Sequence, residues 1–293
     1  VGEGGTGNGY TQGAITGLGS IFVDDVRFED SAATVFDADG ERRSRDDLRL
    51  GMRVEVDSDA ITAGSGGPSA TATRIRFASD LRGPVASVDA ASGVFTMLGQ
   101  TVKIDAATVF DERLRGGLAA ISAGHVLEVH AGFDPGSGRY RATRVEPASA
   151  TAGLSLRGIV SSLDAASKRF RIGSADYDYS GAGGVPASLA DGSPVRLSLP
   201  RSAPSNGRWS VSSFAAGVNA PAEGHEARVR GFVTSFVSMQ KFSVEGHPVD
   251  ATGVSLPDGV ALGPGVRVEV EGSIDGGVLR ASRVSVRGDR QEE

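Results

Sequence analysis

The chain of 293 residues contains 42 glycines, 12 prolines and no cysteine, and only 6% of its residues are aromatic. This composition favours many short strands joined by tight turns over long helices, and the lack of cysteine excludes disulfides and thiolate chemistry. With 36 acidic and 30 basic residues the net charge is −6, which excludes a general attraction to phosphate backbones or anionic lipid.

The first element in chain order is a Gly-rich stretch at residues 1–10, a composition that behaves as a flexible tether. No apolar run approaches the roughly 20 residues needed to cross a bilayer, and no basic and then apolar signal sequence opens the chain. We expect the chain as given to be soluble, with a further segment upstream of the tether.

A glycine followed by alternating apolar and polar residues then opens four segments. The spacing between these glycines is about 70 to 75 residues, a range in which a fixed period signals an array of structural units. Each segment also contains a second glycine before an alternating stretch, and a closing stretch such as residues 72–75. The four opening glycines are Gly13, Gly83, Gly158 and Gly231, and the four internal ones are Gly51, Gly124, Gly192 and Gly265.

These landmarks predict four repeats between two polar ends. The alternation is interrupted near residues 79, 152 and 222, which sets the borders between repeats. The predicted division is a tether at 1–10, repeats at 11–79, 80–151, 152–221 and 222–288, and a polar tail at 289–293, the third repeat being divergent.

Within each repeat the apolar residues recur with period two, as in a strand with one buried face. Turn sequences that begin with aspartate, such as residues 89–93 and 134–138, separate the strands. The side chains predicted to point into the core are Val54, Val56, Leu127, Val129, Val195, Leu197, Val268 and Val270. The intervening positions predicted to face water are Glu55, Glu128, Arg196 and Glu269.

Each repeat therefore holds five short strands, with room for one helical turn before the fourth, at residues 44–50 and 114–123. This is the element order of the OB-fold, a partly open Greek-key barrel. The predicted fold class is all-β, with four tandem five-stranded OB-like barrels, short turns and little helix; other small barrels and sandwich-like units are the alternatives. Because units of this size bury little apolar surface alone, we expect neighbouring repeats to pack together.

Residues 95–111 carry a pattern similar to that of a known bacterial family. Residues 95–102 read Phe-x-x-Leu-Gly-x-x-Val, and residues 105–111 read Asp-Ala-Ala-Thr-Val-Phe-Asp, which returns in part at residues 33–37. The chain resembles, most closely over 11–150, a tandem-repeat domain of unknown function found in proteobacterial cell-envelope lipoproteins. The resemblance implies an envelope location, periplasmic or surface-exposed, and a lipidated cysteine just ahead of the Gly-rich start; it supplies no catalytic residues.

The four histidines are the only soft metal ligands in the chain. Alternation places His125 on one face of its strand, and Glu128 with His130 on the opposite, water-facing one. Zinc needs three or four convergent ligands, so this pair is interpreted as ordinary surface, and His225 and His247 as loop or strand-edge residues. No metal site is predicted from them.

Residues 37–41, Asp-Ala-Asp-Gly-Glu, resemble the start of a calcium-binding loop. The EF-hand pattern requires a bidentate glutamate at its twelfth position, where this chain has Leu48. The segment is therefore interpreted as a solvated turn closed by aspartate side-chain hydrogen bonds. Calcium held by loops of different repeats would leave no linear motif and stays an alternative.

No catalytic or cofactor-binding residue is predicted. Ser65 and Ser137 lie in Gly-rich turn sequences without the strand-to-helix elbow of a serine nucleophile. The glycines of residues 5–9 and 13–19 precede strands rather than a phosphate-binding helix, and are interpreted as tether and turn. Carboxylates paired in space would escape a linear search, but sugar-cleaving clefts usually carry aromatic platforms, and only Trp209 and four tyrosines are available.

An OB-like fold raises the question of single-stranded nucleic acid, which such barrels bind with stacking aromatics and a basic groove. Arg42, Arg43 and Arg45 form one basic cluster, but Asp46 and Asp47 follow at once. Outward aromatic positions are not repeated from segment to segment, so nucleic acid is not the expected partner.

The expected function is that of a non-enzymatic cell-envelope binding or scaffold lipoprotein, which contacts a protein or polysaccharide through barrel loops and exposed strands. One alternative is a single-stranded oligonucleotide-binding module, which a basic, aromatic-lined groove would favour. The other is an envelope hydrolase, which needs a deep pocket with convergent carboxylates or a Ser/His pair. No cofactor is expected, and membrane contact is expected only through an upstream lipid anchor.

Overall fold

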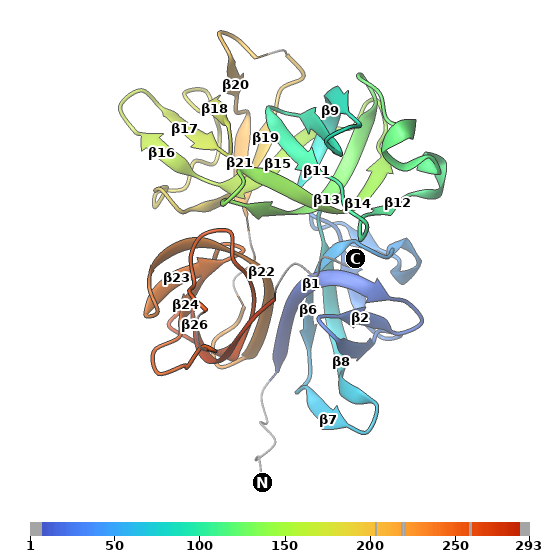
Figure 1. The fold of residues 1–293 in the computed structure, drawn as a ribbon, viewed down its shortest axis with the longest axis vertical. Coiled ribbons are helices and arrows are strands. Elements are labelled where there is room, and N and C mark those ends of the chain that lie inside the picture. The colour runs from blue at the N-terminus through green and yellow to red at the C-terminus, as the bar shows by residue number, and fades with distance from the viewer. Residues whose placement is uncertain (1–7, 203, 218, 220, 258–259, 288–293) are drawn as a thin grey trace. The chain divides into compact units, whose positions relative to one another are not determined.

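The computed structural model describes residues 8–202, 204–217, 219, 221–257 and 260–287, and these form an all-β chain with three short 3-10 turns (Figure 1). The chain divides into two compact units, one made of residues 1–78 with 220–293 and the other of residues 79–219. None of the helical turns in the described ranges has the length and apolar character of a membrane-crossing helix.

The first unit begins with a five-stranded barrel, which we call barrel A. Its strands pair in the closed order β1-β2-β3-β8-β6-β1. All neighbours in this ring are antiparallel except β3 and β8, which run parallel. The elements of barrel A are β1 (Gly9–Gly17), β2 (Ile21–Val23), β3 (Val26–Glu29), β4 (Thr34–Phe36), β5 (Arg42–Arg43), η1 (Arg45–Asp47), β6 (Arg53–Ser58), β7 (Thr62–Gly64) and β8 (Gly67–Phe77). β1 therefore includes the last two residues of the predicted tether, whose residues 1–7 lie outside the described ranges, as does the predicted tail at 289–293.

Barrel D completes the first unit and closes by the same pairing order, β22-β23-β24-β26-β25-β22, with β24 and β26 parallel. Its strands are β22 (Glu226–Ser238), β23 (Lys241–Val244), β24 (His247–Asp250), β25 (Arg267–Asp275) and β26 (Val278–Val286). The first strands of barrels A and D pair in parallel, Gly9–Gln12 beside Glu226–Val229, so the two barrels share one 13-stranded sheet. Segments from the two ends of the chain thus form one unit.

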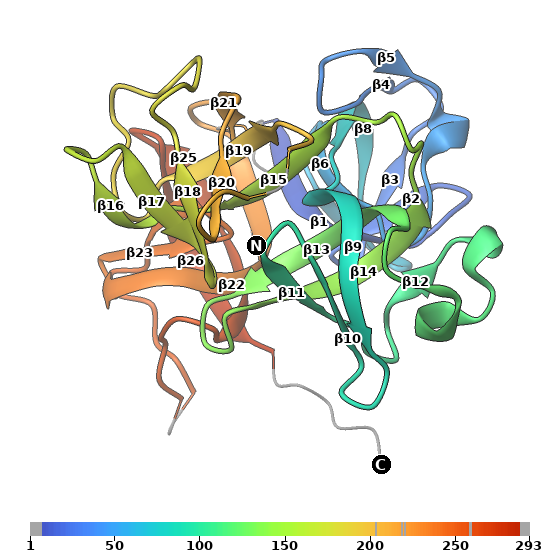
Figure 2. The same cartoon turned by 90° about the horizontal axis from the view of Figure 1, so that it is seen from above.

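The second unit contains barrel B, which closes as β9-β10-β11-β14-β13-β9, again with one parallel pair, β11 and β14. Figure 2 shows the strands of this barrel, β9, β10, β11, β13 and β14. The elements of barrel B are β9 (Leu81–Asp89), β10 (Val94–Met97), β11 (Gln100–Lys103), β12 (Val109–Phe110), η2 (Glu112–Leu114), η3 (Gly117–Ala120), β13 (Val126–Asp134) and β14 (Arg139–Pro147).

We call the rest of the second unit segment C. Its strands pair in an order equivalent to that of the three barrels, but they are divided between two sheets. β15 and β16 are separated at Val160, and β20 and β21 at Val211 and Ser212. Segment C joins barrel B through β9 and β15, which pair antiparallel over Leu81 and Arg82. Its strands are β15 (Leu154–Ile159), β16 (Ser161–Asp164), β17 (Arg169–Ile172), β18 (Ala175–Asp178), β19 (Pro194–Leu199), β20 (Arg208–Ser210) and β21 (Ser213–Ala216).

The predicted core register is confirmed. All eight predicted side chains, in β6, β13, β19 and β25, are at most 2% exposed. The predicted water-facing position in the same strands is wrong in the first unit, because Glu55 and Glu269 are 7% and 2% exposed. These two strands flank the parallel pair β1 and β22, so packing between barrels A and D covers their outer face as well.

The predicted helical turns and hairpin turns are also confirmed. Ser44 caps η1 in a capping box, and Asp111 caps η2. In the hairpin turn after β9, the Asp89 carboxylate accepts hydrogen bonds from the backbone N–H groups of Ala91 and Ser92 at 3.1 and 3.2 Å. Aspartate starts this turn because its carboxylate accepts hydrogen bonds from backbone N–H groups that have no strand partner in the turn.

Gly13 and Gly231, the opening glycines of barrels A and D, lie beneath a side chain from the next hairpin. A Cβ at Gly13 would be 2.7 Å from the Oδ1 of Asp24, and one at Gly231 would overlap the Cγ of Glu245. Asp24 and Glu245 each start a two-residue turn with positive φ, 52° and 51°. Only glycine leaves room for these carboxylates to fold back over the first strand.

Candidate functional site

The histidines do not converge. His125 is exposed and its Nε2 lies 3.1 Å from the hydroxyl of Ser122 in a turn. The prediction that His130 is a surface residue is wrong, since it is 2% exposed; β13 lies between β9 and β14, and His130 faces the equally buried Arg144. The described residues contain no group of three or more His, Asp or Glu side chains able to hold a metal ion.

The acidic segment at residues 37–41 is a turn, as expected. The Asp37 Oδ1 accepts hydrogen bonds from the backbone N–H groups of Asp39 and Glu41 at 2.9 and 3.0 Å, and Oδ2 accepts one from the Arg43 guanidinium at 2.7 Å. Partial burial opposes ionisation, but the Arg43 and backbone hydrogen bonds prevail and lower the pKa of Asp37. The segment thus uses its own donors to satisfy its carboxylate.

The remaining sequence candidates also take structural positions. Ser65 and Ser137 lie in hairpin turns, and the Ser137 hydroxyl donates to the Asp134 carboxylate at 2.8 Å. The interpretation of residues 13–17 as a turn is wrong, because they belong to β1 and Gly13 is needed there to admit Asp24.

Two arginines of the basic cluster, and the tryptophan, contact groups within the chain. Arg43 pairs with Asp37, and the Arg45 guanidinium lies 3.4 Å from the Asp30 carboxylate. Trp209 is half-buried on β20 and packs over the Gly99 turn. These side chains hold neighbouring segments together.

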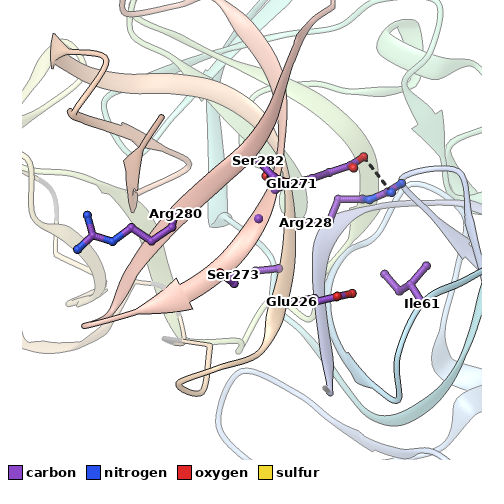
Figure 3. Close-up of a pocket in the computed structure, with 9 residues that line it drawn as sticks. Ile61, Glu226, Arg228, Glu271, Ser273, Arg280 and Ser282 are labelled. Atoms are coloured by element: carbon purple, nitrogen blue, oxygen red, sulfur yellow. Dashed lines mark hydrogen bonds and ion pairs between the residues drawn. The ribbon is translucent and has the colours of Figure 1, made fainter. Parts of the chain in front are cut away.

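The structure adds a groove that the sequence analysis missed. It lies on the first unit, has a volume of about 440 Å³ and is lined by β22, β25 and β26 of barrel D and by Ile61 of barrel A (Figure 3). The polar lining residues are Glu226, Arg228, Glu271, Ser273, Arg280 and Ser282. No sequence pattern indicated that these side chains and Ile61 line one groove.

The groove is polar and its charges are balanced. The Arg228 guanidinium lies 2.9 Å from the Glu271 carboxylate, the ion pair drawn in Figure 3, and Arg280 pairs with Asp250 and Asp275. Ser282 donates its hydroxyl hydrogen bond to the backbone carbonyl of Glu271 at 3.2 Å. The lining therefore presents hydrogen-bond donors and acceptors side by side.

A buried charge cluster lies where barrels A and D meet. Arg230 on β22 contacts three carboxylates: Asp24 at 3.0 Å, Asp25 at 2.8 Å and Glu269 at 2.6 Å. Arg287 adds a second contact to Glu269 at 2.6 Å. Asp24 and Glu269 are only 1% and 2% exposed, so the cluster is a buried ionic connection between the barrels.

Burial and charge shift the two buried carboxylates in opposite directions. Burial raises the pKa of Asp24 to about 7, more than Arg230 lowers it, and the Oδ2 atom has no hydrogen-bond partner among the described residues. Burial also opposes ionisation of Glu269, but the hydrogen bonds from Arg230 and Arg287 prevail and lower its pKa to about 2. Glu269 is therefore the stably ionised member of the cluster.

A second set of contacts runs from barrel D back to barrel A. Arg53 and Glu245, each 8% exposed in the side chain, form an ion pair at 2.7 Å. His247 on β24 packs edge-on against Tyr10, and its Nε2 is hydrogen-bonded to Gln12. The predicted strand-edge position of His247 is thus part of the joint between the barrels.

These features define a class of protein: an all-β chain of tandem small barrels that assemble through polar contacts. More particularly, residues 12–76, 82–146 and 230–285 match the family described as "Domain of unknown function (DUF5666)", and the chain belongs to this family. The three matches coincide with barrels A, B and D and confirm the predicted tandem repeat of a domain of unknown function. No curated protein matches the chain.

Proposed function

We propose that this chain is a non-enzymatic binding and scaffold protein of the bacterial cell envelope, and that the groove of the first unit takes a segment of polysaccharide. The observation that carries the proposal is the charge-balanced lining of the groove. Neutral hydroxylated ligands need donors and acceptors together, and paired guanidinium, carboxylate and hydroxyl groups supply both. An anionic chain would instead need cations that are not already paired with carboxylates.

The chemistry of the groove favours binding over hydrolysis. Glu271 carries two guanidinium partners, Arg228 at 2.9 Å and Arg283 at 2.7 Å, which suits a fixed acceptor rather than a proton donor. The single-stranded nucleic acid alternative is less well supported, because the described residues that line the groove include no aromatic side chain for base stacking.

The finer fold assignment is part of the same proposal: segment C is a fourth, diverged copy, and all four copies are OB-like. The support is the shared pairing order, in which the first strand pairs with the second and fourth and the third runs parallel to the fifth. The divergence of segment C is seen in its fourth strand, which has Arg196 where β6, β13 and β25 have glutamate.

The envelope location and an upstream lipid anchor rest on the resemblance of residues 11–150 to proteobacterial envelope lipoproteins. Fractionation of the producing bacterium tests this part separately. We expect the protein in the envelope fraction and its release by detergent, and recovery in the cytosolic fraction would contradict the location.

Isothermal titration with purified envelope polysaccharides, both neutral and acidic, tests the binding proposal. Ser282→Trp fills the groove, and Thr73→Trp is the matched control, since Thr73 occupies the same closing position in barrel A and also donates to a backbone carbonyl, that of Asp57. We expect Ser282→Trp to weaken binding at least about tenfold, a loss of about 1.4 kcal/mol, and Thr73→Trp to leave it unchanged. Equal binding by the two variants, or no binding by the native chain, would contradict the proposal.

A further inference from the structure

Each barrel or segment carries a two-residue turn between its second and third strands, which we call the tip. The tips of barrels A and D begin with a carboxylate, whereas those of barrel B and segment C do not. The four tips are Asp24-Asp25, Leu98-Gly99, Gly173-Ser174 and Glu245-Gly246.

The repeats differ at two positions in, or just before, the first strand, which are contacted by the tip of barrel A and by His247, just after the tip of barrel D. These positions lie three residues and one residue before the opening glycine, so they share one face of the strand. Counted in chain order the pairs are Tyr10/Gln12, Asp80/Arg82, Ser155/Arg157 and Arg228/Arg230. Only the first strand of barrel D offers two arginines.

In barrels A and D, the hairpin that carries the tip of each barrel contacts the first strand of the other. The tip of barrel A meets both arginines: the Asp24 carboxylate lies 3.0 Å from Arg230, and the Asp24 carbonyl accepts a hydrogen bond from Arg228 at 3.3 Å. In return, His247, just after the tip of barrel D, contacts Tyr10 and Gln12 on the first strand of barrel A.

The tips of the second unit make neutral hydrogen bonds instead, beside one ion pair between barrel B and segment C, in which Arg157 lies 3.7 Å from Asp80. The hydroxyl of Tyr177 on β18 donates to the carbonyl of Leu98 in the tip of barrel B at 2.8 Å. The side-chain amide of Gln100 donates to the carbonyl of Ile172, just before the tip of segment C, also at 2.8 Å. The two units therefore use the same element with different chemistry.

We propose that the tip is the surface by which one repeat recognises another, and that the acidic tip of barrel A selects barrel D through its Arg228/Arg230 strand. The selection explains a pairing between the two ends of the chain rather than between sequence neighbours. Barrel B and segment C offer one arginine each at these positions, and each already has a carboxylate partner: Arg82 lies 3.3 Å from Glu128, and Arg157 lies 3.7 Å from Asp80. At the first position, Asp80 would place a like charge against the tip of barrel A, and Ser155 provides no charge.

Hydrogen–deuterium exchange on the full chain at pH 8 tests this selection. Protection of residues 9–12 and 226–229 reports the β1–β22 pairing, protection of residues 278–286 reports barrel D itself, and residues 139–147 serve as an internal reference. The reversal Asp24→Lys places a cation against both arginines. Asp37→Lys is its control, because the hydrogen bonds that the Asp37 carboxylate accepts from described residues all come from barrel A.

A second pair of variants removes a charge without reversing it. This pair keeps the test decisive if Asp24→Lys also unfolds barrel D. Arg228 and Arg283 both pair with Glu271, at 2.9 and 2.7 Å, and both lie 3.7 Å from Glu269, but only Arg228 reaches the tip residue Asp24. Arg228→Gln is therefore compared with Arg283→Gln.

We expect exchange at residues 9–12 and 226–229 to rise at least about tenfold in Asp24→Lys and to rise in Arg228→Gln, with both controls like the native chain. Native-like exchange in Asp24→Lys would overturn the proposal. If residues 278–286 also lose protection in Asp24→Lys, equal exchange of residues 9–12 in Arg228→Gln and Arg283→Gln would overturn it.

Discussion

The Asp24 carboxylate of the first barrel lies 3.0 Å from the Arg230 guanidinium of the last barrel, at a point where Asp24 is 1% exposed. The contact ties together two segments that the chain separates by the whole of the second unit. Because burial raises the pKa of Asp24 to about 7, its ionic contribution changes across the neutral pH range.

The difference in pH dependence between the native chain and Asp24→Asn isolates this carboxyl. Its pKa is about 7 in the folded chain, against an ordinary value of 3.8, so between these values the folded chain binds the extra proton. The stability of the native chain relative to Asp24→Asn should fall as pH rises from about 4 to 7, by up to about 4 kcal/mol, and then level off. Urea unfolding from pH 4 to 8 measures the difference, and a difference that is constant with pH would contradict the assignment.

Glu269 should show the opposite sign. Its pKa is lowered from 4.5 to about 2, so the stability it contributes is fully present above pH 4.5 and is lost as pH falls through this range. Glu269→Gln should destabilise the first unit at pH 7 by about 2 kcal/mol, since it removes the buried, ionised carboxylate that Arg230 and Arg287 share. The control is Glu128→Gln, at the same strand position but half-buried and 3.3 Å from Arg82, and it should cost well under about 1 kcal/mol.

Truncation of the core should depend on the register observed in β25. Val270→Ala removes two methyl groups from a side chain that is 0% exposed and should destabilise the protein by about 1 to 3 kcal/mol. Val237→Ala, at a position 74% exposed, should change stability by less than about 0.5 kcal/mol. Equal midpoints for the two variants in urea would show that the inward face is assigned incorrectly.

The opening glycine of barrel D should tolerate no side chain. Gly231→Ala places a methyl group on Glu245 and displaces it from Arg53, so we expect a loss of about 2 kcal/mol or more. Gly263→Ala is the control, because its added methyl group meets nothing within 4 Å. Thermal unfolding followed by circular dichroism measures both, and the same melting temperature for the two variants would contradict the role of Gly231.

Removal or addition of metal should leave stability unchanged. A metal that binds only the folded state raises stability with its concentration, so EDTA and added zinc provide a direct test. We expect the same melting temperature in EDTA, in zinc and in millimolar calcium. A clear rise with calcium would indicate oxygen ligands from separate loops, which leave no linear motif.

The local structure was predictable from sequence because it depends on short-range chemistry. The period-two pattern placed Val54 and Val268 in the core, and aspartate at the start of a turn predicted the hairpin after Asp89. The candidate site was not predictable. Glu269 was expected to face water, because a strand pattern shows which side of a barrel is inside but not which other barrel covers the outside. Its partner Arg230 comes from another strand, which the pattern of β25 does not indicate.

The most direct test of the account is whether the two ends of the chain form one folded unit. Protease sites introduced after residues 78 and 219, the borders of the two compact units, allow the folded chain to be cut into three fragments. We expect the fragment ending at residue 78 and the fragment beginning at residue 220 to remain bound in a 1:1 complex on size-exclusion chromatography in native buffer. Separate elution of these two folded fragments would contradict it.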